Sequence, residues 1–200
     1  MRFQLAVLLA FSALAPAQPA EAPAKAPAEA PAKPPAKSAA HAFMIDRVGA
    51  APISLSAYRG KLVMLVFINT ECSHCQEFTE KLIPIAKEYG PRGVQFIECA
   101  VNGDALLMVP GFVDRFHPPF PVGYNTDRPQ VEKFLGRQIL YVPSVTFLSR
   151  TGKIVGDYPG ESDFMKNGPE NTRAELDKLL KPAPPRAKKA AAKPGAEGSK

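Results

Sequence analysis

The chain reads Lys61-Leu-Val-Met-Leu-Val-Phe-Ile68 and then Asn69-Thr-Glu-Cys72-Ser-His-Cys75. A continuous apolar run of this kind is typical of a central β-strand that is covered on both faces. Beyond Cys75 the apolar residues fall at helical intervals as far as Tyr89, where Gly90-Pro91 ends the pattern. The cysteine pair is therefore expected where a buried strand passes into the start of a helix.

The sequence on either side completes a mixed α/β pattern. Val94–Cys99 reads as a second buried strand, and strand, helix, strand in this order predicts a parallel crossover unit. Further on, two strands separated by a turn at Arg150-Thr-Gly152 predict an antiparallel hairpin. The remaining expected elements are strands at 144–148 and 153–158, and helices within 104–116, at 130–137 and from Gly168 onward.

Both ends of the chain differ from its middle. Residues 1–17 combine Arg2, an apolar run and small residues before Gln18, which is typical of a secretory signal peptide. Residues 18–41 and 182–200 repeat Ala, Pro and Lys and have no larger aliphatic side chain to bury, so we expect them to stay disordered. The predicted folded domain is residues 42–181.

Charge and hydropathy exclude two classes of protein. The net charge is +6 overall, but residues 42–180 carry 15 Lys and Arg against 16 Asp and Glu, so the positive charge resides in the ends. The predicted domain has no basic patch with interleaved aromatic residues, so nucleic acid is not an expected partner. No apolar run approaches the roughly 20 residues of a membrane-spanning helix, so no transmembrane segment is expected in the mature chain.

The position of the cysteine pair points to redox chemistry. The positive end of a helix stabilises a thiolate on Cys72, and Cys75 lies one turn later within bonding reach. A structural disulfide is the alternative, but closing a loop of about four residues removes only roughly 2 kcal/mol of unfolded-state entropy. A zinc site would need further ligands, and Cys99 and the three histidines stand at no recognisable spacing.

These motifs resemble the thioredoxin superfamily, and specifically its secreted TlpA-like branch. The resemblance is carried by Leu55-Ser-Ala-Tyr-Arg-Gly-Lys61, by Phe67–Cys75, and by Val142-Pro143-Ser144 before a strand. It implies an α/β fold with a thioredoxin-like mixed sheet flanked by helices. It also implies an N-terminal hairpin and a helix-strand insertion at residues 103–126.

The resemblance assigns roles to individual residues. It implies that Cys72 is the exposed nucleophile and Cys75 the buried resolving thiol. It implies a cis-proline at Pro143 that faces the pair, with Val142 offering its backbone to a substrate strand. Ser73 and His74, between the cysteines, are expected to tune the redox properties, since an imidazolium there can stabilise the thiolate as in strongly oxidising members.

One departure concerns the proton that the reaction must move. Thioredoxin has a buried aspartate six residues before its first cysteine, whereas this chain has Val66 there. Glu71 and Glu77 flank the motif and are candidates for the missing group. Cys99 leaves an odd count, and it is either a buried inert thiol or a third redox cysteine.

The sequence thus predicts an extracytoplasmic protein thiol-disulfide oxidoreductase, periplasmic or secreted, that favours the reductase direction. Its partners would be proteins with disulfides or thiols and a membrane-borne dithiol electron donor, and it needs no organic cofactor or metal. Two alternatives stay open: a copper or haem delivery module on the same fold, and a peroxiredoxin-like peroxidase. Against the second, Asn69 stands where a peroxide site needs threonine.

Overall fold

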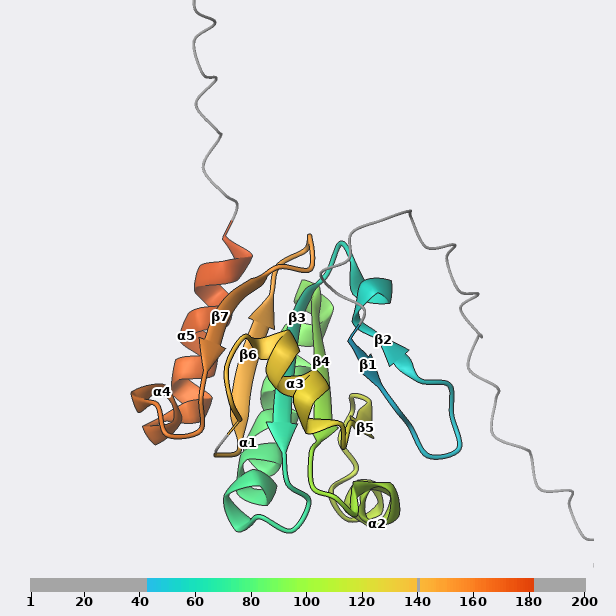
Figure 1. Cartoon of the computed structure of the whole chain (residues 1–200). Coiled ribbons are helices and arrows are strands. Elements are labelled where there is room, and N and C mark those ends of the chain that lie inside the picture. The colour runs from blue at the N-terminus through green and yellow to red at the C-terminus, as the bar shows by residue number, and fades with distance from the viewer. Residues whose placement is uncertain (1–42, 140, 182–200) are drawn as a thin grey trace, which may run out of the picture. The chain divides into compact units, whose positions relative to one another are not determined.

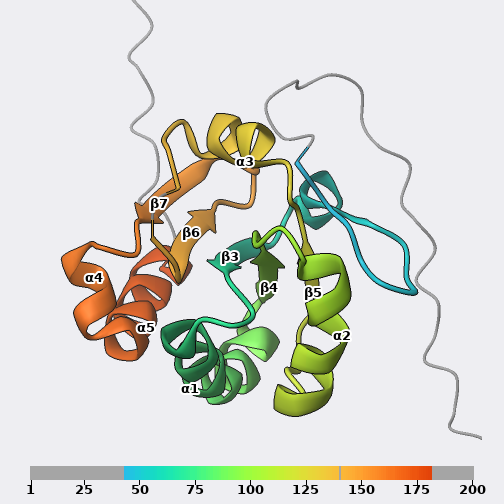
Figure 2. The same ribbon diagram turned by 60° about the horizontal axis from the view of Figure 1, so that its bottom comes forward.

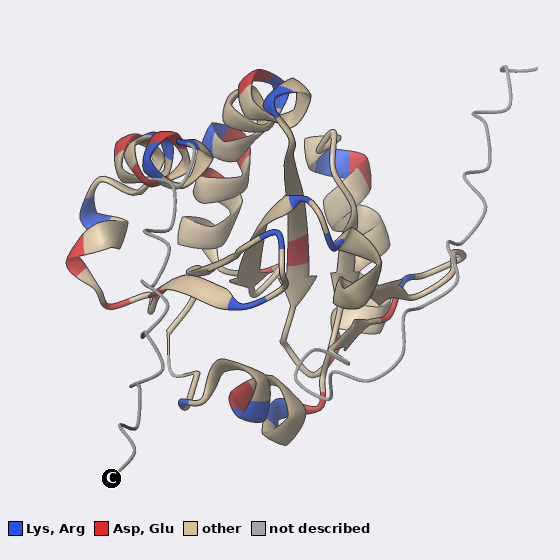
Figure 3. Ribbon diagram, turned by 90° about the horizontal axis from the view of Figure 1, so that it is seen from above, with Lys and Arg blue, Asp and Glu red and all other residues tan. Residues whose placement is uncertain are grey.

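The computed structural model describes residues 43–139 and 141–181 (Figure 1). The predicted signal peptide (1–17), linker (18–41) and basic tail (182–200) lie outside the described residues, so these boundaries stay predictions. No described helix is both long and apolar enough to cross a membrane. On the described helices, basic and acidic residues are interspersed rather than gathered by sign (Figure 3).

A five-stranded mixed sheet forms the centre of the fold, in the order β5-β4-β3-β6-β7 (Figure 1). β3, β4 and β5 are parallel, whereas β6 runs antiparallel to β3, and β7 antiparallel to β6. Every residue of β3 is buried, as its continuous apolar sequence predicts. The strands are β3 (Leu62–Ile68), β4 (Val94–Ala100), β5 (Val122–Tyr124), β6 (Ser144–Leu148) and β7 (Ile154–Tyr158).

Helices cover both faces of this sheet, as Figure 2 shows. One face packs against α1, α2 and α5, and the other packs against α3. Successive residues of β3 alternate between the two cores: Met64 and Val66 face α1, while Leu65 and Phe67 face α3. The helices are α1 (Ser73–Tyr89), α2 (Ala105–Phe116), α3 (Arg128–Leu135), α4 (Asp163–Lys166) and α5 (Gly168–Leu180), with 3₁₀ turns η1 (Leu55–Tyr58) and η2 (Gly90–Arg92).

The two features that the resemblance implied are present. An antiparallel hairpin of β1 (Met44–Ile45) and β2 (Ile53–Ser54) precedes β3. The insertion consists of α2 and β5, and β5 extends the sheet beside β4. The predicted fold class is therefore confirmed.

Two elements differ from their predicted form. The helix expected at 130–137 is shifted towards the N-terminus, because Asp127 Oδ1 accepts a hydrogen bond from the Gln130 amide (3.0 Å) and Gly136 ends the helix in the left-handed conformation. The short helix α4 was not predicted. It lies beside α5, where it contributes Met165 to the core on the α1 side.

Candidate active site

The cysteine pair lies at the junction of β3 and α1. Cys72 is the N-cap residue of α1, so Cys75 falls in the first turn of that helix. The Cys72 side chain is partly exposed, whereas Cys75 is 0% exposed, and both are free thiols. Burial raises the pKa of the Cys75 thiol far above its usual range, and nearby Cys72 and Glu98 add to the shift. One thiol is therefore open to another protein, while the other is covered and protonated at neutral pH.

Hydrogen bonds fix the loop that carries the pair. The Thr70 amide donates to Asn102 Oδ1 (3.2 Å), and Asn102 Nδ2 donates back to Thr70 Oγ1 (2.9 Å). The Asn69 amide donates to Cys75 Sγ (3.4 Å). Because Asn102 follows β4, the loops after two neighbouring parallel strands are tied together at the same edge of the sheet. These contacts hold the loop before α1 and place the sulfur of Cys75.

A second segment, just before β6, faces the pair. The peptide bond between Val142 and Pro143 is cis. Cys72 Sγ lies 4.0 Å from the carbonyl oxygen of Val142, while Pro143 is buried beneath it. The structure thus brings together Cys72, Val142 and Pro143, which the sequence places far apart. Their assigned roles in catalysis and substrate binding stay predictions.

The Val142–Pro143 segment is braced from both sides. Arg137 donates to both carboxylate oxygens of Asp157, and its Nη2 also donates to Ser144 Oγ (2.8 Å). On the other side Gly160 lies against the backbone of Tyr141, so closely that an added Cβ would stand 2.8 Å from the carbonyl carbon. The backbone that faces Cys72 is therefore held by tertiary contacts that the local sequence does not reveal.

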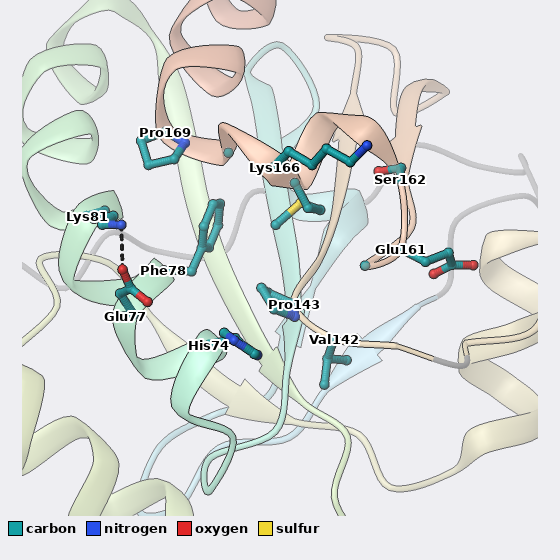
Figure 4. Close-up of a pocket in the computed structure, with 13 residues that line it drawn as sticks. His74, Glu77, Phe78, Lys81, Val142, Pro143, Glu161, Ser162, Lys166 and Pro169 are labelled. Atoms are coloured by element: carbon teal, nitrogen blue, oxygen red, sulfur yellow. Dashed lines mark hydrogen bonds and ion pairs between the residues drawn. The ribbon is translucent and has the colours of Figure 1, made fainter.

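A cavity of about 410 Å³ opens beside Pro143 (Figure 4). His74 and Phe78 of α1 line one wall, and Met165 of α4 lines another. Ser73 and His74 are exposed at the start of α1, and the His74 side chain lies on the Pro143 side of the helix (Figure 4). The redox-tuning role predicted for these two residues stays a prediction.

Sequence reasoning missed a buried acid beneath the pair. Glu98 on β4 is 0% exposed, and its Oε1 lies 2.8 Å from Thr79 Oγ1. Thr79 Oγ1 in turn lies 3.0 Å from the carbonyl oxygen of Cys75. Burial raises the pKa of Glu98 to about 8, a shift that the hydrogen bond from Thr79 partly offsets. In the parallel pairing of β3 with β4, Glu98 is the partner of Val66, which occupies the position of the buried aspartate of thioredoxin.

The two acids that the sequence suggested as proton carriers lie at the surface. Glu71 is exposed in the loop before Cys72. Glu77 is exposed on α1 and accepts a hydrogen bond from Lys81 at 2.6 Å, which lowers its pKa. The signal for Glu98 was its place in β4, where Val94, Phe96 and Ala100 share its side of the strand and all pack towards α1.

Cys99 lies apart from the pair. It is 0% exposed and belongs to the core on the α3 face of the sheet, whereas Cys75 belongs to the core on the α1 face. Burial also raises the pKa of this thiol. Within the described part of the chain, no group of three or more His, Cys, Asp or Glu side chains is arranged to hold a metal ion.

The fold and its paired cysteines at a strand-to-helix junction define a protein of the thioredoxin superfamily, as the resemblance predicted. The chain belongs to the Redoxin family, whose model matches residues 32–179.

Relatives and solved structures agree with this assignment. The thiol-disulfide oxidoreductase ResA of Bacillus thuringiensis subsp. konkukian is 24% identical over 144 residues, which cover 72% of this chain and 75% of that protein. ResA of Oceanobacillus iheyensis is 27% identical over 109 residues, covering 54% of this chain and 55% of that protein. A thioredoxin family thiol:disulfide interchange protein of Chlorobium tepidum has the same fold, with a TM-score of 0.56, 22% identity and coverage of 68% and 94%. Together with the family match, these relatives support thiol-disulfide exchange as the class of chemistry.

Proposed function

We propose that this protein is an extracytoplasmic thiol-disulfide oxidoreductase that reduces disulfides in other proteins through Cys72 and Cys75. The observation that carries the proposal is the asymmetry of the pair. Cys72 is partly exposed at a helix N-terminus and faces the Val142 carbonyl, while Cys75 is fully buried one turn later. An exposed nucleophile with a covered partner can attack a protein disulfide and then release it.

The first step uses Cys72. The positive end of α1 favours negative charge at this position, and the thiolate is the form that attacks. A bond forms between Cys72 Sγ and one sulfur of the substrate disulfide, and the substrate S–S bond breaks. The other substrate sulfur leaves as a thiolate and takes up a proton from water. The result is a mixed disulfide between Cys72 and the substrate.

The second step uses Cys75. Its thiol loses a proton, and its sulfur attacks Cys72 Sγ to form the Cys72–Cys75 disulfide. The bond from Cys72 to the substrate breaks, and the second substrate sulfur leaves as a thiolate that is then protonated. Two electrons have passed from the pair to the substrate, and an external dithiol must return them. We propose a membrane-borne dithiol as that donor.

The segment before β6 provides the place where a substrate strand would lie. Val142 O stands 4.0 Å from Cys72 Sγ, so a substrate backbone beside Val142 brings its own cysteine within reach of the nucleophile. The cavity next to this point is lined by the apolar side chains of Phe78 and Met165 and also by charged ones such as Lys166, so it suits a substrate side chain that has both apolar and polar groups (Figure 4). Specific substrates would then differ in the residue that fills the cavity.

The proposed location rests on residues 1–17, whose pattern is that of a signal peptide. The proposed direction of electron transfer, reduction of the substrate, rests on the resemblance to the TlpA-like branch. His74 favours the opposite direction, oxidation of the substrate. Equilibration with glutathione measures the reduction potential that decides between them. We expect a value nearer to about −270 mV, as in thioredoxin, than to about −120 mV, as in DsbA. A potential near the second value would make the protein an oxidase.

Reduction of insulin disulfides tests the chemistry itself. Cys72→Ala is expected to abolish activity, because no exposed nucleophile remains. Cys75→Ala is expected to accumulate mixed disulfides with the substrate, because nothing resolves them. Cys99→Ala is the matched control and should keep its activity, since Cys99 lies on the other face of the sheet. Full activity in both of the first two variants would show that the proposal is wrong.

A further inference from the structure

Glu98 is a buried carboxyl group without full hydrogen bonding. It is 0% exposed on β4, and the only hydrogen-bond partner of its carboxyl group among the described residues is Thr79 Oγ1, at 2.8 Å from Oε1. Its second oxygen, Oε2, is buried and has no partner within the described residues. Burying an ionised carboxylate in this way costs several kcal/mol, so the neutral form predominates near pH 7 and the ionised form, which alone can accept a proton, is the minor one.

The hydroxyl of Thr79 links Glu98 to the backbone of Cys75. This hydroxyl lies within hydrogen-bond distance of both Glu98 Oε1 and the carbonyl oxygen of Cys75 (2.8 and 3.0 Å). A threonine hydroxyl has one hydrogen, and the Cys75 carbonyl can only accept. Thr79 donates to one acceptor at a time: to the Cys75 carbonyl while Glu98 is neutral, and to Glu98 Oε1 when Glu98 is ionised, which is why Thr79 lowers the pKa of Glu98. Ionised Glu98 would compete with the carbonyl for that hydrogen.

Among the described residues, the ionisable group whose pKa Glu98 raises is the Cys75 thiol. From α1, Cys75 faces Glu98 across Thr79, with Cys72 beyond. β3 presents Val66 at the opposing position and β5 presents Val122, neither of which titrates. α2 contributes apolar side chains to the same core, among them Phe112 and Phe116. The protonation states of Glu98 and Cys75 are therefore coupled.

Resolution of the mixed disulfide needs a proton acceptor in this place. Cys75 must lose its proton to attack Cys72, yet it is fully buried and is not in contact with bulk water. The exposed acids Glu71 and Glu77 lie on the solvent side of the pair. Glu98 is the buried base on the protein side, with one carboxylate oxygen free to take a proton.

We propose that Glu98, in its ionised form, accepts the proton of Cys75 during the resolving step, an inference that rests on the function proposed above. The Cys75 S–H bond breaks and an O–H bond forms on Glu98. The Cys75–Cys72 bond forms as the bond from Cys72 to the substrate breaks, and the released substrate thiolate is protonated by water. When the pair is reduced again, Glu98 returns its proton to Cys75.

The pKa directions suit this role. Burial raises the pKa of Glu98 to about 8 and raises that of Cys75 further. A base with a pKa close to the working pH gives the best compromise between being ionised and being strong enough to accept a proton. Bond formation to Cys72 consumes the Cys75 thiolate as it appears, which draws the transfer forward.

The test separates the two steps in the full-length reduced protein. A stoichiometric chromogenic aromatic disulfide releases one coloured thiolate when Cys72 attacks and a second when Cys75 resolves. In Glu98→Gln we expect an unchanged first phase and a second phase slowed by about 10²-fold, a typical loss for a general base. The second phase of the unmodified protein should rise with pH through an inflection near 8, and this inflection should vanish in Glu98→Gln.

Glu80→Gln is the matched control, because Glu80 is an exposed glutamate on α1, and it should change neither phase. An unaltered second phase and pH profile in folded Glu98→Gln would overturn the inference while leaving the proposed function intact. Absence of the first phase in the unmodified protein would instead contradict the function. Should Glu98→Gln fail to fold, Thr79→Val decides: the inflection must move upward, since Thr79 lowers the pKa of Glu98, and an unmoved inflection refutes the role.

Discussion

Replacing Glu98 with glutamine should make the free energy of unfolding depend much less on pH between about pH 5 and pH 8. Burial raises the pKa of Glu98 from 4.5 to about 8 in the folded state. Below the lower value both states bind the proton, so the group adds no pH dependence. Between the two values only the folded state binds it, and the free energy of unfolding falls by about 1.4 kcal/mol per pH unit. The complete loss, reached above the folded value of about 8, is about 5 kcal/mol.

Urea unfolding between about pH 5 and pH 8 measures this effect, because the window lies between the two pKa values. The comparison uses slopes, since glutamine also changes stability by an amount that does not depend on pH. The contribution of Glu98 should appear as the difference between two slopes of unfolding free energy against pH, that of the unmodified protein and that of Glu98→Gln. Glu80→Gln, which removes an exposed carboxyl from α1, should retain the slope of the unmodified protein. Equal slopes in Glu98→Gln and the unmodified protein would show that Glu98 is ionised in the fold and would refute the reasoning.

Three further changes probe the rest of the site. His74→Pro leaves α1 intact, because proline is tolerated in a first turn, and should lower the reduction potential by at least about 30 mV in glutathione equilibration; an unchanged potential removes His74 from redox tuning. Gly160→Ala places a Cβ 2.8 Å from the Tyr141 carbonyl carbon, so KM for insulin should rise several-fold while the rate with a small aromatic disulfide stays the same; equal effects on both would contradict this. Arg137→Met leaves the half-buried Asp157 without its partner and should cost about 1–3 kcal/mol in urea unfolding, with a cycle through Asp157→Asn showing the coupling; additive costs would mean that the pair is not a unit.

The parts of the fold that could be predicted are those specified by local sequence. The apolar run Leu62–Ile68 predicts a strand buried on both faces, and it is buried at every position. The helical spacing after Cys75 predicts α1, and the turn at Arg150–Gly152 predicts the β6-β7 hairpin. Each of these signals lies within a short window and depends on periodicity or turn chemistry alone.

The active-site geometry was predictable only where a motif names its residues. Cys72 and Cys75 are adjacent in sequence, so their position at a helix start follows from the strand before them. The approach of Val142 to Cys72 was implied by the resemblance and not by any local pattern. It depends on the Arg137–Asp157 pair and on the contact of Gly160 with Tyr141, which join distant parts of the chain.

Glu98 shows why the remaining part of the site was missed. The alternation in β4 places it on the same side as Val94 and Phe96, so the sequence already indicates an acid that faces a core. The strand pattern cannot indicate that α1 covers this face, which depends on how the helix packs, or that Glu98 lies opposite Val66, which depends on the register between β3 and β4. The acids next to the cysteines in the sequence are Glu71 and Glu77, and both are exposed to solvent. A buried base must instead come from the neighbouring strand of the sheet, since only the strands beneath the helix start reach the covered side of Cys75.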